Sequence, residues 1–269
     1  MPLSVCATPI GNLRDITLRV LDELAEADLV LCEDTRRTRI LLDRHGLSAR
    51  LVSYHEHNEA ARTAEVLPQL EAGARVALVS DAGLPGISDP GARLIAATLE
   101  LGIPVTVLPG ASSVETALVA SGFASERYQF LGYLPRGESA LATFWDELRR
   151  WPWPAVAFES PRRLPRTLAS LAETMPERPV AVCRELTKQF EEVIRGDAAA
   201  VAERFSEPPK GEITIVFGPS SGSEDSRDEE QALAALDELV VAGLARRHAA
   251  DLVARLTGTS RNTLYRRSL

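Results

Sequence analysis

A short apolar run that leads directly into a loop rich in glycine, proline and aspartate constrains the fold of this chain most strongly. Residues 76–79 read as a buried strand, and residues 80–91 then hold three Gly, two Pro and two Asp. Glycine lets a ligand approach the backbone, proline stiffens the loop, and carboxylates accept hydrogen bonds. A plain connection between a strand and a helix needs only a few residues. We therefore expect a ligand-binding loop, with an ordinary turn as the alternative.

The alternation of strand-like and helix-like segments before residue 110 predicts a parallel α/β sheet. The strand candidates are residues 3–7, 27–32, 75–80 and 103–108, and the helix candidates lie near residues 16–26, 60–72 and 91–101. Ligands bind such a sheet at the carboxyl ends of its strands. Besides the loop 80–91, the polar loops 8–12, 33–36 and 109–113 are expected at this edge.

A second α/β segment follows, in which the strands are separated by fewer helices. The strand candidates are residues 128–133, 155–159, 180–184, 192–195 and 212–217, and the helix candidates are residues 138–150 and 162–174. Three strand candidates in close succession predict a mixed sheet with antiparallel pairs. We expect an N-terminal α/β domain of residues 1–113, a second α/β domain of residues 114–220, and a binding site in the cleft between them.

The end of the chain differs from both domains. Residues 221–230 are acidic and contain Ser, which predicts a flexible linker, and residues 231–269 predict a helical tail domain. Residues 245–269 carry six Arg and one Asp, and their apolar spacing with a break before Ser260 indicates a helix-turn-helix. Two roles are open for this tail: contact with RNA, or packing as a helical hairpin on the body or on a partner subunit.

Composition sets broad limits on compartment and partners. A hydrophobic content of 45% and a net charge of -8 describe a soluble globular protein and argue against a surface coated in phosphate contacts. The three cysteines lie in strand-like runs without the spacing of a metal site, which favours reduced thiols and a cytoplasmic location. Neither a targeting segment nor an apolar run of membrane-spanning length is found.

Several classes of enzyme lack their motif in this chain. The dinucleotide fingerprint, the phosphate-binding P-loop and the serine nucleophile elbow are all absent. His55 and His57 bracket Glu56, but the sequence shows no third ligand, so we expect no metal and a polar loop near the cleft. Group transfer remains, because positioning of two reactants supplies most of its rate. Only two of the 30 basic residues are lysines, Lys188 and Lys210, and an ammonium can lose its proton whereas a guanidinium cannot.

Eight short motifs occur in order along nearly the whole chain. They are Thr8–Leu13, Glu33–Arg36, Ser53–Asn58, Ser80–Gly83 with Ile87–Gly91, Pro109–Ser113, Gly132–Pro135, Glu159–Pro161 and Arg184–Lys188. Together they resemble the bacterial 16S ribosomal RNA (cytidine-2'-O)-methyltransferase family. The resemblance implies a fold of the tetrapyrrole methylase type: two α/β domains with S-adenosylmethionine (SAM) in the trough between them, and a small C-terminal helical segment.

The resemblance also implies an activity and its partners. It implies methyl transfer from SAM to the ribose 2'-hydroxyl of a cytidine in the decoding region, with 16S rRNA or the small ribosomal subunit as partner, a homodimer, and no membrane. Two alternatives stay open: a small-molecule methyltransferase acting on a tetrapyrrole precursor, and a noncatalytic ribosome-assembly factor that binds RNA. A macrocycle site has no need of a basic tail, and an assembly factor has no reason to bind SAM.

The resemblance places the donor contacts on loops of both domains. They are Pro9, Ser80, Asp81, Ala82, Gly83, Ile87, Ser112 and Ser113 in the first domain, and Phe158, Glu159, Leu186 and Thr214 in the second. Leu84 and Gly86 depart from the family's pattern, in which a Thr and an apolar residue are expected. Leu84 lacks the hydroxyl of that Thr, so we expect one polar contact fewer at this position.

A ribose hydroxyl is a poor nucleophile until its proton is removed, so a base is expected. Lys188 is the first candidate, because an ammonium beside a cation such as Arg184 can have its pKa lowered. Glu185, Glu159 and His55 are alternatives, and Lys188 is equally suited to binding phosphate. Arginines then serve the RNA: Arg36, Arg37, Arg162 and Arg163 at the approach to the trough, and Arg261, Arg266 and Arg267 in the tail.

Overall fold

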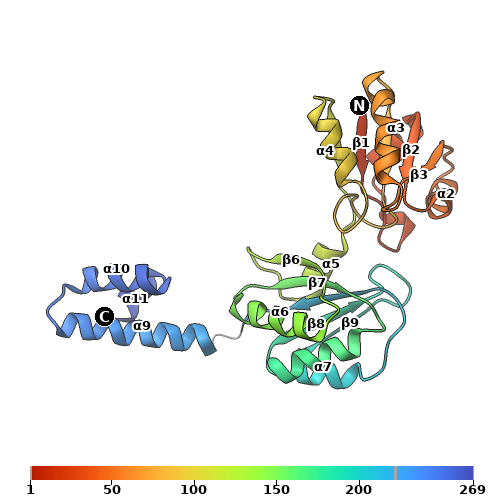
Figure 1. Ribbon diagram of the computed structural model, residues 1–269. Helices are drawn as coiled ribbons and strands as arrows, with labels where there is room; N and C mark the ends of the chain where they lie inside the picture. The colour runs from red at the N-terminus through yellow and green to blue at the C-terminus, as the bar shows by residue number, and fades with distance from the viewer. Residues whose placement is uncertain (1, 221–222, 269) are drawn as a thin grey trace.

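The computed structural model describes residues 2–220 and 223–268, and the side chains of all of these except residues 223–230. The chain forms two five-stranded sheets with their helices, followed by three helices that pack on one another (Figure 1). The two sheets confirm the expected α/β class. No helix in the described part of the chain has the length and apolar character needed to span a membrane.

The first sheet is entirely parallel, as predicted, with the strand order β3-β2-β4-β1-β5. Its strands are β1 (Leu3–Cys6), β2 (Leu29–Cys32), β3 (Leu51–Ser53), β4 (Val76–Val79) and β5 (Val105–Leu108). The helical segments are η1 (Leu13–Asp15), α1 (Leu18–Glu26), α2 (Thr35–Arg44), α3 (Glu59–Glu71) and α4 (Ala92–Glu100). Side chains of α3 and α4 cover one face of this sheet, and those of α1 and α2 cover the other.

The register of the central strands brings three loops together. Cys6 at the end of β1 lies beside Val79 of β4 on one side and Leu108 of β5 on the other. The loops that follow these three residues therefore start next to one another at the carboxyl edge of the sheet. This is the edge at which the sequence predicts the ligand.

The second sheet is mixed, also as predicted, with the order β6-β7-β10-β8-β9 and one parallel pair, β6 with β7. Its strands are β6 (Gln129–Tyr133), β7 (Ala155–Glu159), β8 (Pro179–Arg184), β9 (Glu192–Asp197) and β10 (Ile213–Phe217). The helices are α5 (Ser113–Ser121), α6 (Glu138–Arg150), α7 (Leu164–Thr174) and α8 (Ala198–Arg204). Helix α5 packs against β7, β8, β9 and β10, although it follows the first sheet directly. The division of the chain after residue 113 stays a prediction.

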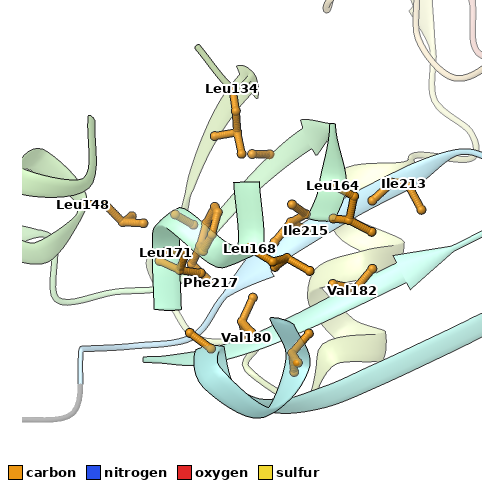
Figure 2. Close-up of a cluster of buried hydrophobic side chains, with 14 of the residues drawn as sticks. Leu134, Leu148, Leu164, Leu168, Leu171, Val180, Val182, Ile213, Ile215 and Phe217 are labelled. Carbon is orange, nitrogen blue, oxygen red and sulfur yellow. The ribbon is translucent and has the colours of Figure 1, made fainter. Parts of the chain in front are cut away.

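Strand β10 shows how the second sheet separates its core from its site. Ile213, Ile215 and Phe217 point into the core beneath α6 and α7, where they meet Leu168 of α7 (Figure 2). Side chains alternate across a strand, so Val216 and Thr214 point to the opposite face. Val216 packs there in the cluster that contains α5, and Thr214 faces the space between the two sheets.

The tail folds into α9 (Ser223–Val241), α10 (Arg246–Thr257) and α11 (Arg261–Arg267), held by a small apolar core that includes Leu236, Val253 and Leu264. The hydroxyl of Ser260 accepts from Thr263 N–H and caps α11, as expected from the sequence. The structure corrects the expected linker: residues 223–230 belong to α9, and residues 221–222 lie outside the described residues. Negative charge near a helix N-terminus interacts favourably with the helix dipole. An acidic composition is therefore also typical of the first turns of a helix.

The two α/β domains meet closely where the loop after β1 faces the turn after β8. The backbone N–H of Asn12 donates to Thr187 Oγ1 at 3.1 Å. A Cβ placed on Gly11 would lie 2.5 Å from Lys188 Cγ and 2.9 Å from the carbonyl oxygen of Leu186. Only glycine permits this approach.

We expect Gly11→Ala to lower the free energy of unfolding by about 1–3 kcal/mol, because an extra methyl group overpacks this contact. Gly137→Ala is the matched control, since a Cβ there would meet no atom within 4 Å, and we expect it to change the stability by less than about 1 kcal/mol. Urea denaturation of both variants measures the difference. Equal stabilities would show that the domains do not depend on close approach at Gly11.

Candidate functional site

The loop between β4 and α4 is fixed to the loop after β1 by two backbone hydrogen bonds. Thr8 N–H donates to Gly83 O at 2.8 Å, and Gly83 N–H donates to Thr8 O at 3.1 Å. Gly83 has a φ of +83°, in the left-handed region that favours glycine. The hydroxyl of Ser80 is buried and donates to Gly83 O at 3.1 Å. The loop is thus rigid and presents its backbone to the cleft, while Ser80 supports it from within.

A cavity of about 480 Å³ lies between the two domains, with walls from both. Most of the donor contacts expected from the resemblance line it: Asp81, Ala82, Gly83, Ile87, Ser112, Ser113, Phe158, Glu159 and Thr214. We call this space the main cavity. Leu84 lies in the same wall, so the departure from the family pattern falls on the site itself.

A second cavity of about 280 Å³ adjoins the main cavity and shares Arg37, Asp81, Ala82 and Glu212 with it. The remaining first-domain candidates, Pro9 and Ser80, line this second cavity together with Lys188. Leu186 lines neither of them and lies in a smaller hollow of about 60 Å³ with Ser113 and Thr214. The expected donor residues are therefore gathered around one cleft but divided among three spaces.

Asp81 ties the main cavity to helix α2. Its carboxylate accepts from Asp34 N–H at 3.1 Å and pairs with Arg37 Nη1 at 3.3 Å. Arg36 pairs instead with Asp34, the residue that caps α2, and its side chain is 87% exposed. Of the four arginines expected at the RNA approach, Arg37 thus lines the cleft and Arg36 is its neighbour at the start of α2.

Glu159 lines the main cavity, but its carboxylate is turned inward and forms an internal anchor with Arg163. The carboxylate of Glu159 is fully buried and accepts from Ser160 N–H and the Thr167 hydroxyl, both at 2.7 Å. It also pairs with Arg163, whose guanidinium donates to the carbonyl oxygens of Leu134 and Pro135. Arg163 is therefore engaged inside the domain, contrary to its expected place among the RNA contacts. Arg162, its neighbour, is exposed, because a turn sends successive side chains in different directions.

The structure contradicts the reason for treating Lys188 as the base. Its Nζ donates to Glu185 Oε1 at 2.8 Å and to Glu212 Oε2 at 2.9 Å. Partial burial lowers the pKa of Lys188, but these hydrogen bonds outweigh it and the pKa is raised. The same contact with Lys188 lowers the pKa of Glu185. Lys188 is held as an ammonium and Glu185 as a carboxylate of reduced basicity.

Arg184 does not accompany Lys188. Its guanidinium pairs with Glu192 at 3.0 Å and donates to the carbonyl oxygen of Lys210 at 3.2 Å. It lines a separate open hollow next to Arg204 and Pro208. Arg184 ends strand β8, so the two basic residues leave the strand end in different directions, and Arg184 is not among the cleft residues.

The cleft also contains two acidic residues that were not among the expected donor contacts or bases. Asp89 and Glu33 line the main cavity. Burial and the nearby Glu33 carboxylate raise the pKa of Asp89 to about 6, and burial together with Asp81 raises the pKa of Glu33. Both residues belong to the eight motifs, so the sequence did point to the segments that contain them. Their mutual proximity depends on the order of strands in the sheet, which the motifs do not state.

The remaining candidates are distributed over other parts of the surface. His55 and His57 lie in the segment between β3 and α3, and Asn58 Oδ1 accepts from His55 N–H at 2.9 Å. Among the described residues, no group of three or more His, Cys, Asp or Glu could hold a metal ion. In the tail, Arg261 pairs with Asp251, and the side chain of Arg266 is exposed, as is that of Arg267. All three cysteines are buried and free.

The comparisons with known proteins decide the family. Residues 2–202 match the family model of tetrapyrrole (corrin/porphyrin) methylases. The chain belongs to the tetrapyrrole methylase family. It is 43% identical to the ribosomal RNA small subunit methyltransferase I of Mesorhizobium japonicum over 99% of this chain and 91% of that protein. The protein of the same name from Synechocystis is 40% identical over 99% of this chain and 97% of its own length.

Solved structures agree with the tetrapyrrole methylase fold. A uroporphyrin-III C-methyltransferase from Thermus thermophilus superposes with a TM-score of 0.56 at 22% identity, over 83% of this chain and 97% of that one. A diphthine synthase superposes with a TM-score of 0.62 at 14% identity, over 80% and 89%. The family and fold inferred from the eight motifs are confirmed.

Asp89 makes the stability of the protein depend on pH. Its ordinary pKa of 3.8 is raised in the folded state, so folding is penalised when Asp89 is ionised, and the penalty fades as the pH falls from about 6 to below 4. We expect Asp89→Asn to stabilise the protein at pH 8 by about 1–2 kcal/mol, after allowing for solvent screening. Denaturation at pH 8 and pH 4 measures this gain, which should vanish at pH 4. A gain of equal size at both values would contradict the buried environment of Asp89.

Proposed function

We propose that this protein transfers a methyl group from SAM to the ribose 2'-hydroxyl of a cytidine in the decoding region of small-subunit ribosomal RNA. The observation that carries the proposal is the similarity over nearly the full length of both chains to proteins named ribosomal RNA small subunit methyltransferase I. A methyltransferase of the same fold is known in complex with S-adenyl homocysteine, the demethylated form of this donor. The choice of a cytidine, and of its 2'-oxygen as the acceptor atom, rests on the resemblance of the eight motifs.

The main cavity fits the chemistry of SAM, which carries a cationic sulfur and ammonium, a carboxylate and an adenosine. Asp89 and Glu33 supply carboxylates for the cationic end, and Ile87 and Phe158 supply apolar surface. Helix α5 begins at this cavity, and its first residues have no side-chain cap. The N–H groups of a helix start suit a carboxylate.

The residues around the cleft have different roles in the proposed reaction. When bound, SAM supplies an electrophilic methyl group on a positively charged sulfur. Lys188, held as an ammonium by Glu185 and Glu212, attracts anions and does not accept protons near neutral pH. Asp89 lines the main cavity, where its carboxylate is available to the cationic end of the donor. The cleft residues would hold the 2'-hydroxyl in line with the methyl group, and SAM would supply that methyl group to the oxygen while the hydroxyl proton passes to solvent.

Two groups of arginines are proposed to bind the RNA: one near the cavities and one in the C-terminal tail. Arg36, Arg37 and Arg162 are exposed near the approach to the cavities, and the tail carries Arg261, Arg266 and Arg267 on α11. Structured RNA is bound through its phosphates, its unstacked bases and the 2'-hydroxyl. Binding of this kind weakens with salt, because each phosphate contact releases counterions.

Mass mapping of small-subunit RNA tests the proposed function. The RNA, both as naked 16S rRNA and within the small subunit, is incubated with enzyme and methyl-labelled SAM and then digested. We expect one labelled nucleotide, a cytidine that carries the methyl group on its ribose, within the decoding region. A label on a base, or a label elsewhere in the RNA, would contradict the proposed specificity. Labelling of a tetrapyrrole precursor instead, or failure to bind SAM, would favour one of the two alternatives.

The tail is proposed to serve RNA binding and not donor binding. A chain that ends at Ser221 lacks helices α9–α11, which pack on one another in a core of their own. We expect this truncation to weaken RNA affinity at least tenfold and to leave S-adenosylhomocysteine affinity within twofold. Filter binding and isothermal titration measure the two affinities. Unchanged RNA affinity would assign the tail to stability or to subunit contact.

A cytoplasmic location and a homodimer complete the proposal. Three buried free thiols support a reducing compartment.

Exposed apolar side chains at Val107 and Val119, 51% and 70% accessible, offer surface for a second copy. Light scattering at micromolar concentration distinguishes a dimer from a monomer of 29.2 kDa.

A further inference from the structure

The second cavity has walls of a different character from the main cavity. Helix α2 contributes Arg37, Ile40 and Leu41 to it, and residues at this spacing share one face of a helix. Ile10 and Leu13, from the loop after β1, line it as well. Ile40 is 60% exposed, so its apolar side chain is accessible to a ligand in this cavity.

Two cations line this space, and each is paired with a carboxylate that also lines it: Arg37 with Asp81, and Lys188 with Glu212. Arg37 reaches Asp81 with one nitrogen, Nη1 at 3.3 Å, and its side chain is 62% exposed. Lys188 is 26% exposed and is held as an ammonium. Both residues line the second cavity. Apolar surface with cations beside it matches a nucleotide, whose base has an apolar face and whose phosphate is anionic.

The position and size of the second cavity also suit an acceptor nucleotide. It shares Asp81 and Ala82 with the main cavity, so its occupant and the methyl donor would meet at one wall. A volume of about 280 Å³ suits a single nucleotide unit better than a macrocycle or a base-paired stem. An acceptor nucleotide turned out of a helix needs a pocket of this kind.

We propose that the second cavity binds the acceptor pyrimidine nucleotide of the RNA, with its base against the apolar wall that includes Ile40 and its phosphate near Arg37 and Lys188. This inference rests on the proposed function and adds the place of the acceptor to it. The two reactants then occupy adjoining cavities: the donor lies in the main cavity, and the acceptor lies in the second cavity, where Pro9 and Ser80 would contact the acceptor and not the donor. Specificity for a single-stranded nucleotide follows from the size of the second cavity.

Ile40→Asp tests the assignment by placing a charge on the apolar wall. Leu18→Asp is the matched control, because Leu18 is also an exposed apolar side chain, at 79%, near the start of a helix that lines none of these cavities. We expect Ile40→Asp to raise the KM for small-subunit RNA at least tenfold at saturating SAM, and to change the affinity for S-adenosylhomocysteine less than twofold. Leu18→Asp should change both quantities less than twofold. Thermal unfolding of both variants shows that they fold.

The outcomes separate this proposal from the proposed function. A wild-type enzyme that methylates no RNA overturns the proposed function and this inference with it. An active wild type with an Ile40→Asp variant that behaves like Leu18→Asp overturns only the acceptor assignment. A loss of S-adenosylhomocysteine affinity larger than the rise in KM for RNA would place the donor in the second cavity, and also overturns the assignment.

Discussion

The cleft of this protein depends on the close approach of Gly11 and Asn12 in one domain to residues 186–188 in the other. The absence of a Cβ at Gly11 lets Leu186 and Lys188 come within van der Waals distance of the loop after β1. Glu185 and Thr187 hold φ angles of +52° and +64°, which cost of order 1–3 kcal/mol each for residues other than glycine. This strained turn places Lys188 at the second cavity and forms the contact between the domains.

The architecture was predictable where local pattern determines structure. Strands β7 and β10 are apolar runs bounded by polar turns, and the sequence located them to within one residue. Helix α2 and strand β3 were missed. Helix α2 carries many Arg and Thr residues, and β3 has only three half-buried residues. Neither segment therefore shows a strong hydrophobic periodicity in the sequence. Tertiary packing creates both of them.

The site was predictable as a set of loops but not as a set of contacts. Five of the eight motifs contribute residues to the main cavity, because they lie at the ends of neighbouring strands. The partners of Lys188 could not be foreseen: Glu212 comes 24 residues later and reaches Nζ only because β10 pairs with β8, with Ile213 opposite Arg184. The same limit applies to Arg163, whose buried partner Glu159 reverses the role that its charge suggests.

The central claim is that both domains together hold the methyl donor in the main cavity and leave the second cavity to the acceptor. A crystal structure of the protein with S-adenosylhomocysteine tests it most directly. The account predicts that the ligand lies between the loop at Asp81–Gly83 and the strand ends at Phe158 and Thr214, in contact with both domains. A ligand bound within one domain alone, or against Ile40 in the second cavity, would contradict it.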